Sequence, residues 1–144
     1  MQSFDSESVV YGYIRDLNVR EQDLRQLENF SAVSRLEAQH ASSFLSREMF
    51  SLPEKVSSEF DEGLEPESYL IHFGSSYLGV EYEWKQWLAQ FEGLLKKMYW
   101  VSAVVHLETE ISGRHIFQWG VSSDEHKPGE HIQANQLEWV RESQ

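Results

Sequence analysis

The hydrophobic period of the chain changes once between residues 84 and 121, from that of a helix to that of a strand. Residues 84–98 carry one apolar stripe at i, i+3, i+4, i+7, i+10, i+11 and i+14, namely Trp84, Trp87, Leu88, Phe91, Leu94, Leu95 and Met98. Residues 99–109 then alternate strictly between apolar and mostly polar positions. This sequence of periods predicts a helix that packs on a sheet.

A second alternating segment, residues 114–121, predicts a hairpin with the first. A three-residue loop with Gly113 in the left-handed position is a common hairpin closure. It pairs large apolar residues with one another and sets opposite charges across from each other, in the pairs Leu107–Phe117, Val105–Trp119 and Glu110–Arg114. We prefer this register to a two-residue turn at Ser112-Gly113, which places the aromatic residues beside His106 and Glu108.

The rest of the chain completes an α+β pattern. Residues 8–14 and 69–77 read as strands, residues 21–45 as two short helices that break near 29–31, and residues 132–140 as a last short helix or edge strand. Residues 46–67 read as an irregular acidic loop. We therefore expect one domain over residues 1–144, with a mostly antiparallel sheet of about four strands and two or three helices packed on one face.

The charge of the chain restricts its partners. There are 24 acidic and 12 basic side chains, a formal net charge of -12, and no cysteine. Such a charge repels nucleic acid and anionic membrane surfaces, so we expect neither as a partner. A basic protein is the expected partner, and we expect this chain to be a monomer or a weak homodimer. With no leader-like segment and no apolar span in the sequence, we expect a cytoplasmic protein.

The densest group of acids lies in the expected loop. Five carboxylates fall within nine residues with no base among them: Glu59, Asp61, Glu62, Glu65 and Glu67. One interpretation is an electrostatic platform that accelerates association with a basic surface. The other is a solvated loop, since runs of charge often serve only solubility. We take these five residues as the first candidates for partner binding.

The polar side of residues 99–109 supplies three further candidates for partner binding. Trp100 lies in phase with His106 and Glu108, so we expect it to be exposed, and Glu110 follows in the same phase. The H-x-E-x-E alternation also places three potential metal ligands on one strand face. Because no second ligand motif accompanies it, we favour a polar strand face and expect neither a metal nor a cofactor.

No complete catalytic motif is present. The six histidines are scattered, no serine sits in a G-x-S-x-G elbow, and Gly74 to Gly79 lacks the Lys-Ser/Thr of a phosphate-binding loop. We therefore expect a binding protein rather than an enzyme. The alternative is a small accessory enzyme or ligand-binding domain with a pocket between helix and sheet, using His72, His106 or Glu108. A third possibility is an adaptor subunit that self-associates through a sheet edge.

Three segments suggest a family: Phe44-Leu-Ser-Arg-Glu-Met-Phe50, Tyr82-Glu-Trp-Lys-Gln-Trp87 and Tyr99-Trp-Val-Ser-Ala-Val-Val-His-Leu-Glu-Thr-Glu110. In these and in its small, acidic, cysteine-free α+β character, the chain resembles the immunity proteins of bacterial polymorphic toxin and contact-dependent competition systems. The resemblance implies a stoichiometric inhibitor that neutralises a basic effector or toxin by occlusion. It carries over no functional residue by position, because these families share no universal motif.

Overall fold

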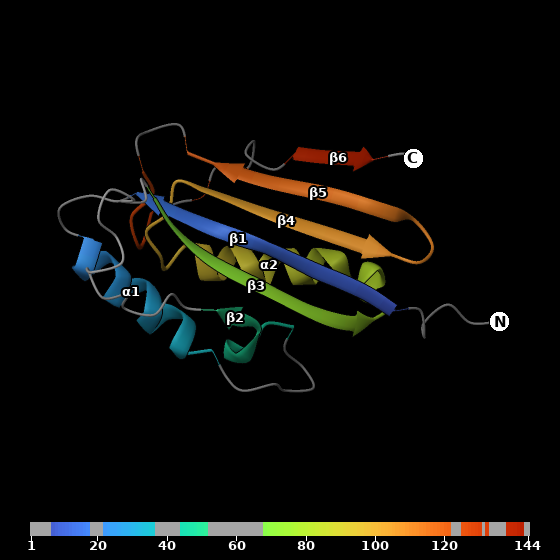
Figure 1. The fold of residues 1–144 in the computed structure, drawn as a ribbon, viewed down its shortest axis with the longest axis horizontal. Helices are drawn as coiled ribbons and strands as arrows, with labels where there is room; N and C mark the ends of the chain where they lie inside the picture. The colour runs from blue at the N-terminus through green and yellow to red at the C-terminus, as the bar shows by residue number, and fades with distance from the viewer. Residues whose placement is uncertain are drawn as a thin grey trace, which may run out of the picture.

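One antiparallel sheet of six strands organises the molecule, in the order β2-β3-β1-β4-β5-β6 (Figure 1). It is a computed structural model that describes residues 7–17, 22–36, 44–51, 68–121, 125–130, 132 and 138–142. The strands are β1 (Glu7–Leu17), β2 (Phe50–Ser51), β3 (Ser68–Leu78), β4 (Ser102–Thr109), β5 (Gly113–Gly120) and β6 (Glu138–Glu142). The earliest strand in the chain, β1, therefore lies between two later ones.

Two α-helices accompany the sheet, α1 (Gln22–Ser34) and α2 (Trp84–Leu95). Two single-turn 3₁₀ helices, η2 (Arg47–Met49) and η4 (Val80–Glu83), precede β2 and α2. In Figure 1, α2 runs behind β1 and β3. The α+β class is confirmed. The sheet has two more strands than the four expected. One is β2, which at two residues is too short to show a pattern in the sequence, and the other is β6, near the C-terminus.

The sheet face that packs on α2, here called the inner face, holds the aromatic core. The ring of Phe91 lies 5.3 Å from that of Phe73 on β3 and 5.1 Å from that of Trp119 on β5, centroid to centroid. Trp84 packs on Phe117 at 5.2 Å. The predicted apolar stripe thus faces the predicted apolar side of the hairpin. The opposite side of the sheet is here called the outer face, and it carries every second residue of each strand.

Gly12 permits a close approach of β1 and β4. A β-carbon at this position would lie 1.9 Å from the carbonyl oxygen of Val104, which is backbone and cannot swing aside. Any side chain at Gly12 would therefore push the two central strands apart.

The hairpin register differs by two residues from the prediction. Thr109 faces Gly113 and Glu108 faces Arg114, so Glu110, Ile111 and Ser112 form the loop. Gly113 has φ 84°, in the left-handed region as expected. The Ser112 N–H donates to Thr109 Oγ1 at 2.7 Å and stabilises this loop. Because a shift by two residues keeps every side chain on its own face, hydrophobicity did not distinguish the two registers.

The expected break within the first helical segment is wrong, because α1 runs unbroken through residues 29–31. Asn29 does not turn back onto its own helix. Its side chain donates to the Tyr99 carbonyl at 3.0 Å and accepts from the Tyr99 N–H at 2.8 Å. Leu24 and Leu27 of this helix are exposed, whereas Ala32 and Val33 are buried.

The expected exposure of Trp100 is also wrong, because only 1% of its surface is accessible. β4 begins at Ser102, so strand alternation does not extend to Trp100. Its Nε1 donates to the Leu95 carbonyl at 2.9 Å, and its ring stacks on that of His126 at 4.9 Å. The two backbones form a β-bridge that fastens residues 125–130 to the end of α2.

The expected irregular loop at 46–67 begins with regular structure. η2 occupies Arg47–Met49, and β2 pairs Phe50 with Phe73 and Ser51 with His72. Residues 52–67 lie outside the described part of the chain. Among the helices that are described, none is both long and apolar enough to cross a membrane.

Candidate functional site

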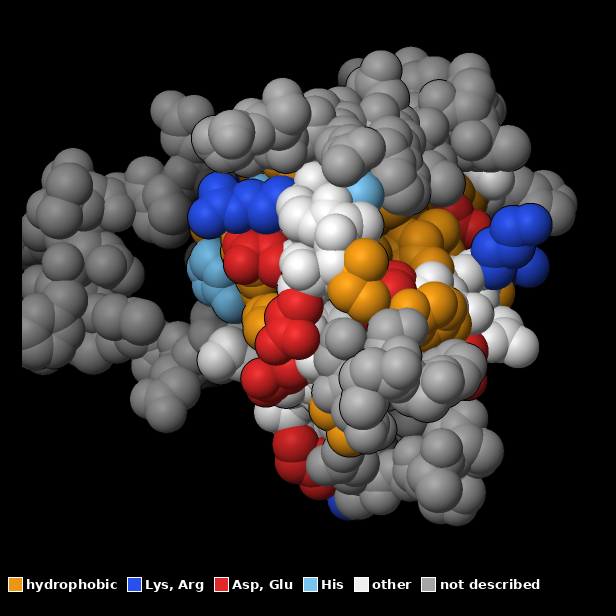
Figure 2. Space-filling model, turned by 90° about the vertical axis from the view of Figure 1, so that its right-hand side faces the viewer, with side chains coloured by type: hydrophobic (Ala, Val, Ile, Leu, Met, Phe, Trp, Pro, Cys, Tyr) orange, Lys and Arg blue, Asp and Glu red, His pale blue; other side chains and the backbone are white. Residues whose placement is uncertain are grey.

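One end of the sheet gathers exposed carboxylates and exposed apolar side chains. Glu7 begins β1 opposite Leu78, the last residue of β3, and the neighbouring pair Ser8–Thr109 brings the β4–β5 loop to the same place. Figure 2 views the molecule from this side and shows acidic side chains beside apolar ones. We call it the acidic end and define it by Glu7, Leu78, Tyr82, Glu83, Glu110 and Ile111.

Local geometry exposes the apolar members of the acidic end. Gly79 adopts φ 69°, which turns the chain from β3 into η4 and leaves Leu78 projecting at the turn. The three-residue hairpin loop projects Ile111 in the same way. The exposed fractions are 68% for Leu78, 58% for Ile111 and 49% for Tyr82. Single exposed apolar residues are common on proteins, but a group of them rimmed by charge is typical of interaction surfaces.

The charge at this end is mainly negative. Glu81 adds a half-buried carboxylate, and its Oε1 accepts a hydrogen bond from Ser8 Oγ at 2.5 Å, which fastens η4 to β1. Two cations lie near the acids. Lys85 is exposed in the first turn of α2, and Arg114 Nε lies 3.3 Å from Glu108 Oε2. Carboxylates therefore outnumber cations at the acidic end, as they do in the whole chain.

A polar cluster beneath the hairpin loop contains a Ser–His contact. Ser112 Oγ lies 2.9 Å from His115 Nε2 and 2.7 Å from Thr109 Oγ1. His115 is buried on the inner face. The serine hydroxyl thus links Thr109, at one end of the loop, to His115 on β5, and these contacts stabilise the hairpin.

The outer face of the sheet carries a second group of aromatic and titratable residues, centred on Tyr11. Its ring stacks on that of His106, with centroids 4.7 Å apart and planes within 5° of parallel. Its hydroxyl donates to Glu108 Oε2 at 2.5 Å. Nearby, Tyr13 and His72 meet edge to face at 6.4 Å. This surface adjoins the acidic end through Glu108 and Arg114.

The predicted partner-binding residues separate into three groups. Glu110 is exposed at the acidic end, and Glu108 is half-buried next to it on the outer face. Trp100 is buried and cannot touch a partner in this fold. The acidic loop residues lie outside the described part of the chain, namely Glu59, Asp61, Glu62, Glu65 and Glu67. Within the described residues, no group of three or more His, Asp or Glu side chains is placed to hold a metal ion.

The residues named for a pocket between helix and sheet lie elsewhere in the fold. His72, His106 and Glu108 all project from the outer face, opposite α2. The space between α2 and the inner face is filled by buried aromatic side chains. These three residues therefore cannot line a cavity there.

A buried ion-pair network at the other end of the sheet was not predicted. Arg25 of α1 donates from Nε to Asp16 Oδ2 at 2.9 Å and from Nη2 to Asp16 Oδ1 at 2.5 Å, and its Nη1 pairs with Glu125. Its guanidinium also lies 4.4 Å from the centroid of the Tyr99 ring. The hydrogen bonds that Arg25 donates to Asp16 raise the pKa of Arg25 above its ordinary value. We call Asp16, Arg25, Tyr99 and Glu125 the ion-pair end.

A signal for this network exists in the sequence. Val10, Gly12, Ile14 and Asp16 share one phase of β1, so Asp16 continues an inward-facing row. A carboxylate in such a position needs a cation.

The two ends of the sheet therefore use charge differently, and the acidic end is the candidate for contact with another molecule. The chain matches no protein-family model, and no match is found among curated proteins or solved structures. The resemblance to immunity proteins therefore stays a prediction, and the acidic end is the structural feature that bears on function.

Proposed function

We propose that this chain is a stoichiometric inhibitor of the immunity type, which binds a basic effector or toxin at its acidic end and blocks it by occlusion. The observation that carries the proposal is the combination there of three exposed apolar side chains, Leu78, Tyr82 and Ile111, with three exposed carboxylates, Glu7, Glu83 and Glu110.

Each half of that combination has its own physical role. Carboxylates on a molecule of net charge -12 attract a basic protein over distances of about 10 Å, and such steering raises association rates by roughly 10–10³-fold. Apolar side chains act only on contact, where excluding water from them slows dissociation. The proposal places this complex in the cytoplasm of a bacterial cell, with one inhibitor per effector.

The geometry of the titratable residues favours inhibition over catalysis. The groups that an accessory enzyme would use, His106 and Glu108, are both engaged by Tyr11 on an open sheet face. Catalytic groups act best in an enclosed, water-poor cavity. A sheet face and a charged end are better suited to contact with another protein.

The test uses the product of the neighbouring reading frame in the source genome, purified and also co-expressed with this chain. We expect growth arrest by that product to be relieved and a 1:1 complex to form, measured by light scattering during gel filtration. Failure of the two proteins to associate would contradict the proposal for that pair.

Charge-reversed variants test whether the acidic end is the binding surface. Glu83→Lys with Glu110→Lys should lower the association rate by about tenfold or more at low salt and flatten its salt dependence. The control is Glu28→Lys, which reverses an exposed carboxylate on α1, away from this end. Equal effects of the two changes would show that only the total charge matters.

Apolar variants test the contact itself. Leu78→Ser should increase the dissociation rate by about tenfold, the usual effect of removing an interface anchor. The matched control is Leu24→Ser on α1, since Leu24 is 67% exposed and Leu78 is 68% exposed. A larger effect of Leu24→Ser would show that the partner binds at α1 and not at the acidic end.

A further inference from the structure

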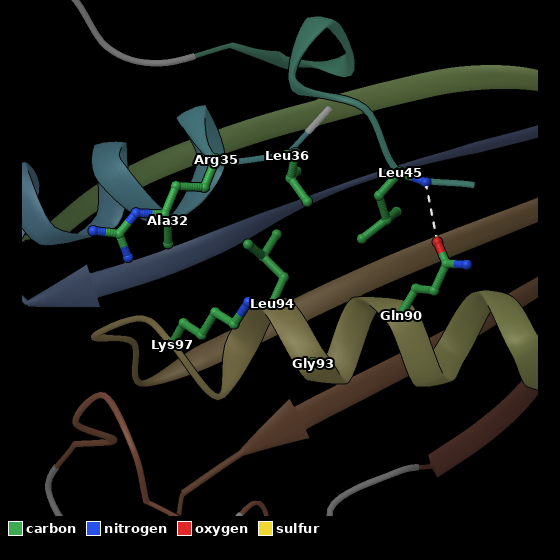
Figure 3. Close-up of a pocket in the computed structure, with 8 residues that line it drawn as sticks. All are labelled: Ala32, Arg35, Leu36, Leu45, Gln90, Gly93, Leu94 and Lys97. Carbon is green, nitrogen blue, oxygen red and sulfur yellow. Dashed lines mark hydrogen bonds between the residues drawn. The ribbon is translucent and has the colours of Figure 1, made fainter. Parts of the chain in front are cut away.

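A small pocket lies between the C-terminal end of α1, Leu45 and the C-terminal half of α2 (Figure 3). Its volume is about 250 Å³. The lining residues are Ala32, Arg35, Leu36, Leu45, Gln90, Gly93, Leu94 and Lys97.

The lining has an apolar part and a cationic part. Ala32, Leu36, Leu45 and Leu94 supply methyl and methylene surface. In Figure 3, the charged side chains of Arg35 and Lys97 lie on the same side of the pocket, and Gln90 lies at the opposite end. Lys97 is exposed, and no ion pair joins either cation to a carboxylate among the residues that the structure describes. Two cations that line one pocket, without an ion pair among the described residues, are unexpected on a chain with twice as many acids as bases.

The far wall of the pocket is held in place by hydrogen bonds. Gln90 Oε1 accepts from the Phe44 N–H at 3.0 Å and from the Leu45 N–H at 3.3 Å. These bonds fix the segment that carries Leu45 against α2. The pocket wall is therefore formed before any ligand arrives, which lowers the entropic cost of binding.

Gly93 contributes backbone but no side chain to the lining of the pocket. Within a helix, glycine is the least favourable residue other than proline. A β-carbon at Gly93 would find no atom within 4 Å, so packing does not require glycine there. A larger side chain at this position has open space before it and should take up part of the pocket that Gly93 lines.

We infer that this pocket binds a small amphipathic carboxylate. The anionic group pairs with Arg35 and Lys97, and a short apolar body lies on the leucines. A water molecule takes up about 30 Å³ in the liquid, so the pocket has room for about eight groups of that size. This inference does not depend on the proposed function, because none of the lining residues belongs to the acidic end.

The probe is hexanoate, which has eight non-hydrogen atoms, added to the uniformly ¹⁵N-labelled full chain. Saturable shifts of the Gly93 and Leu94 amide signals are expected, with a dissociation constant on the order of 1 mM, typical of so small a ligand. Hexan-1-ol should bind at least about tenfold more weakly, and hexylamine should not bind at these residues. The absence of saturable shifts up to about 10 mM hexanoate would overturn the inference.

Variants separate the two parts of the lining. Arg35→Gln with Lys97→Gln should weaken hexanoate binding by about tenfold and leave hexan-1-ol unchanged, since only the carboxylate is recognised by charge. The control, Lys85→Gln, removes an exposed lysine from the first turn of the same helix. If hexanoate binds the double variant as it binds the control, the cations do not form the site.

Gly93→Leu tests the pocket without risking the fold, because leucine favours a helix more than glycine does. The variant should lose hexanoate binding while its thermal midpoint stays equal or rises. Binding that persists in Gly93→Leu would overturn the assignment of this pocket. Glu83→Lys with Glu110→Lys should leave hexanoate binding unchanged, so failure here is distinct from failure of the proposed function.

Discussion

The two ends of the sheet put charged residues to opposite uses. At the ion-pair end, Asp16 and Arg25 are buried and joined by two hydrogen bonds, with Glu125 as a third member. At the acidic end, Glu83 and Glu110 are exposed beside apolar side chains. Removing water from a charge costs several kcal/mol, so a buried charge must have its partner inside the fold. An exposed carboxylate has no such requirement and remains available to another molecule.

The charged residues behind the net charge of -12 therefore have different roles in different parts of the molecule. Part of the charge is balanced locally and contributes to folding. Another part is exposed, and at the acidic end it lies beside exposed apolar residues. Substitutions at the two ends should therefore separate stability from binding.

The largest effect is expected at the ion-pair end. Arg25→Ala should lower the free energy of unfolding by about 3–5 kcal/mol, because it leaves the Asp16 carboxylate buried without a cation. Urea denaturation followed by tryptophan fluorescence measures this. The control is Arg47→Ala, since Arg47 and Glu48 form an exposed pair at 3.9 Å whose loss should cost at most about 1 kcal/mol. Equal losses would mean that burial does not distinguish the two pairs.

An intermediate effect is expected in the interior behind the acidic end, where neutral hydrogen bonds replace ion pairs. Tyr77 donates its hydroxyl proton to the Phe44 carbonyl at 2.7 Å and accepts from Trp87 Nε1 at 3.1 Å. Tyr77→Phe should lower the free energy of unfolding by about 1–2 kcal/mol at neutral pH, because the Trp87 donor loses its acceptor. The exposed Tyr82→Phe should change it by less than about 0.5 kcal/mol.

The same residue predicts a dependence on alkaline pH. Burial raises the pKa of Tyr77 above its ordinary value, so the folded state holds this proton more tightly than the unfolded state. The corresponding stability is complete below about pH 10, the pKa of an unfolded tyrosine, and is lost as pH rises through the raised pKa. The loss of stability above pH 10 should therefore be smaller in Tyr77→Phe than in the native chain. If the urea midpoints of both proteins fell equally as pH rises above about 10, this prediction would be wrong.

The smallest effect is expected at the acidic end. Glu83→Lys with Glu110→Lys should change the free energy of unfolding by less than about 0.5 kcal/mol, since neither carboxylate is buried. Thermal and urea unfolding measure it. A loss comparable to that of Arg25→Ala would mean that the acidic end is a structural element, and the comparison between the ends would no longer hold.

Periodicity predicted those parts of the fold where burial alone determines the pattern. The stripe from Trp84 to Met98 and the inward faces of β4 and β5 were predicted correctly, because one face of each element is covered. The hairpin register was wrong by two residues, since that shift leaves both faces unchanged and the choice depends on contacts of Thr109, Ser112 and His115. The α1 break was wrong because Asn29 bonds across the fold rather than within its helix.

The candidate site was less predictable than the fold. Glu110 was identified from its phase, but Leu78, Tyr82 and Ile111 were not, because turn geometry rather than period exposes them. Trp100 was misplaced because the alternation of β4 was extended into the preceding connection. The ion-pair end joins Asp16, Arg25 and Glu125, and the hydrogen bond to Glu125 spans 100 positions. The periodicity of neighbouring residues cannot predict a contact between residues so far apart in the sequence.

The position of β1 has a consequence for biosynthesis. Its neighbours in the sheet, β3 and β4, begin 51 and 85 positions after its last residue, at Ser68 and Ser102 compared with Leu17. At about 5–20 residues per second, a ribosome needs roughly 3–10 s to reach β3. During that interval the future centre of the sheet has two unsatisfied edges and an apolar face. Until its partners are made, the exposed edges of this first strand can pair with a neighbouring polypeptide.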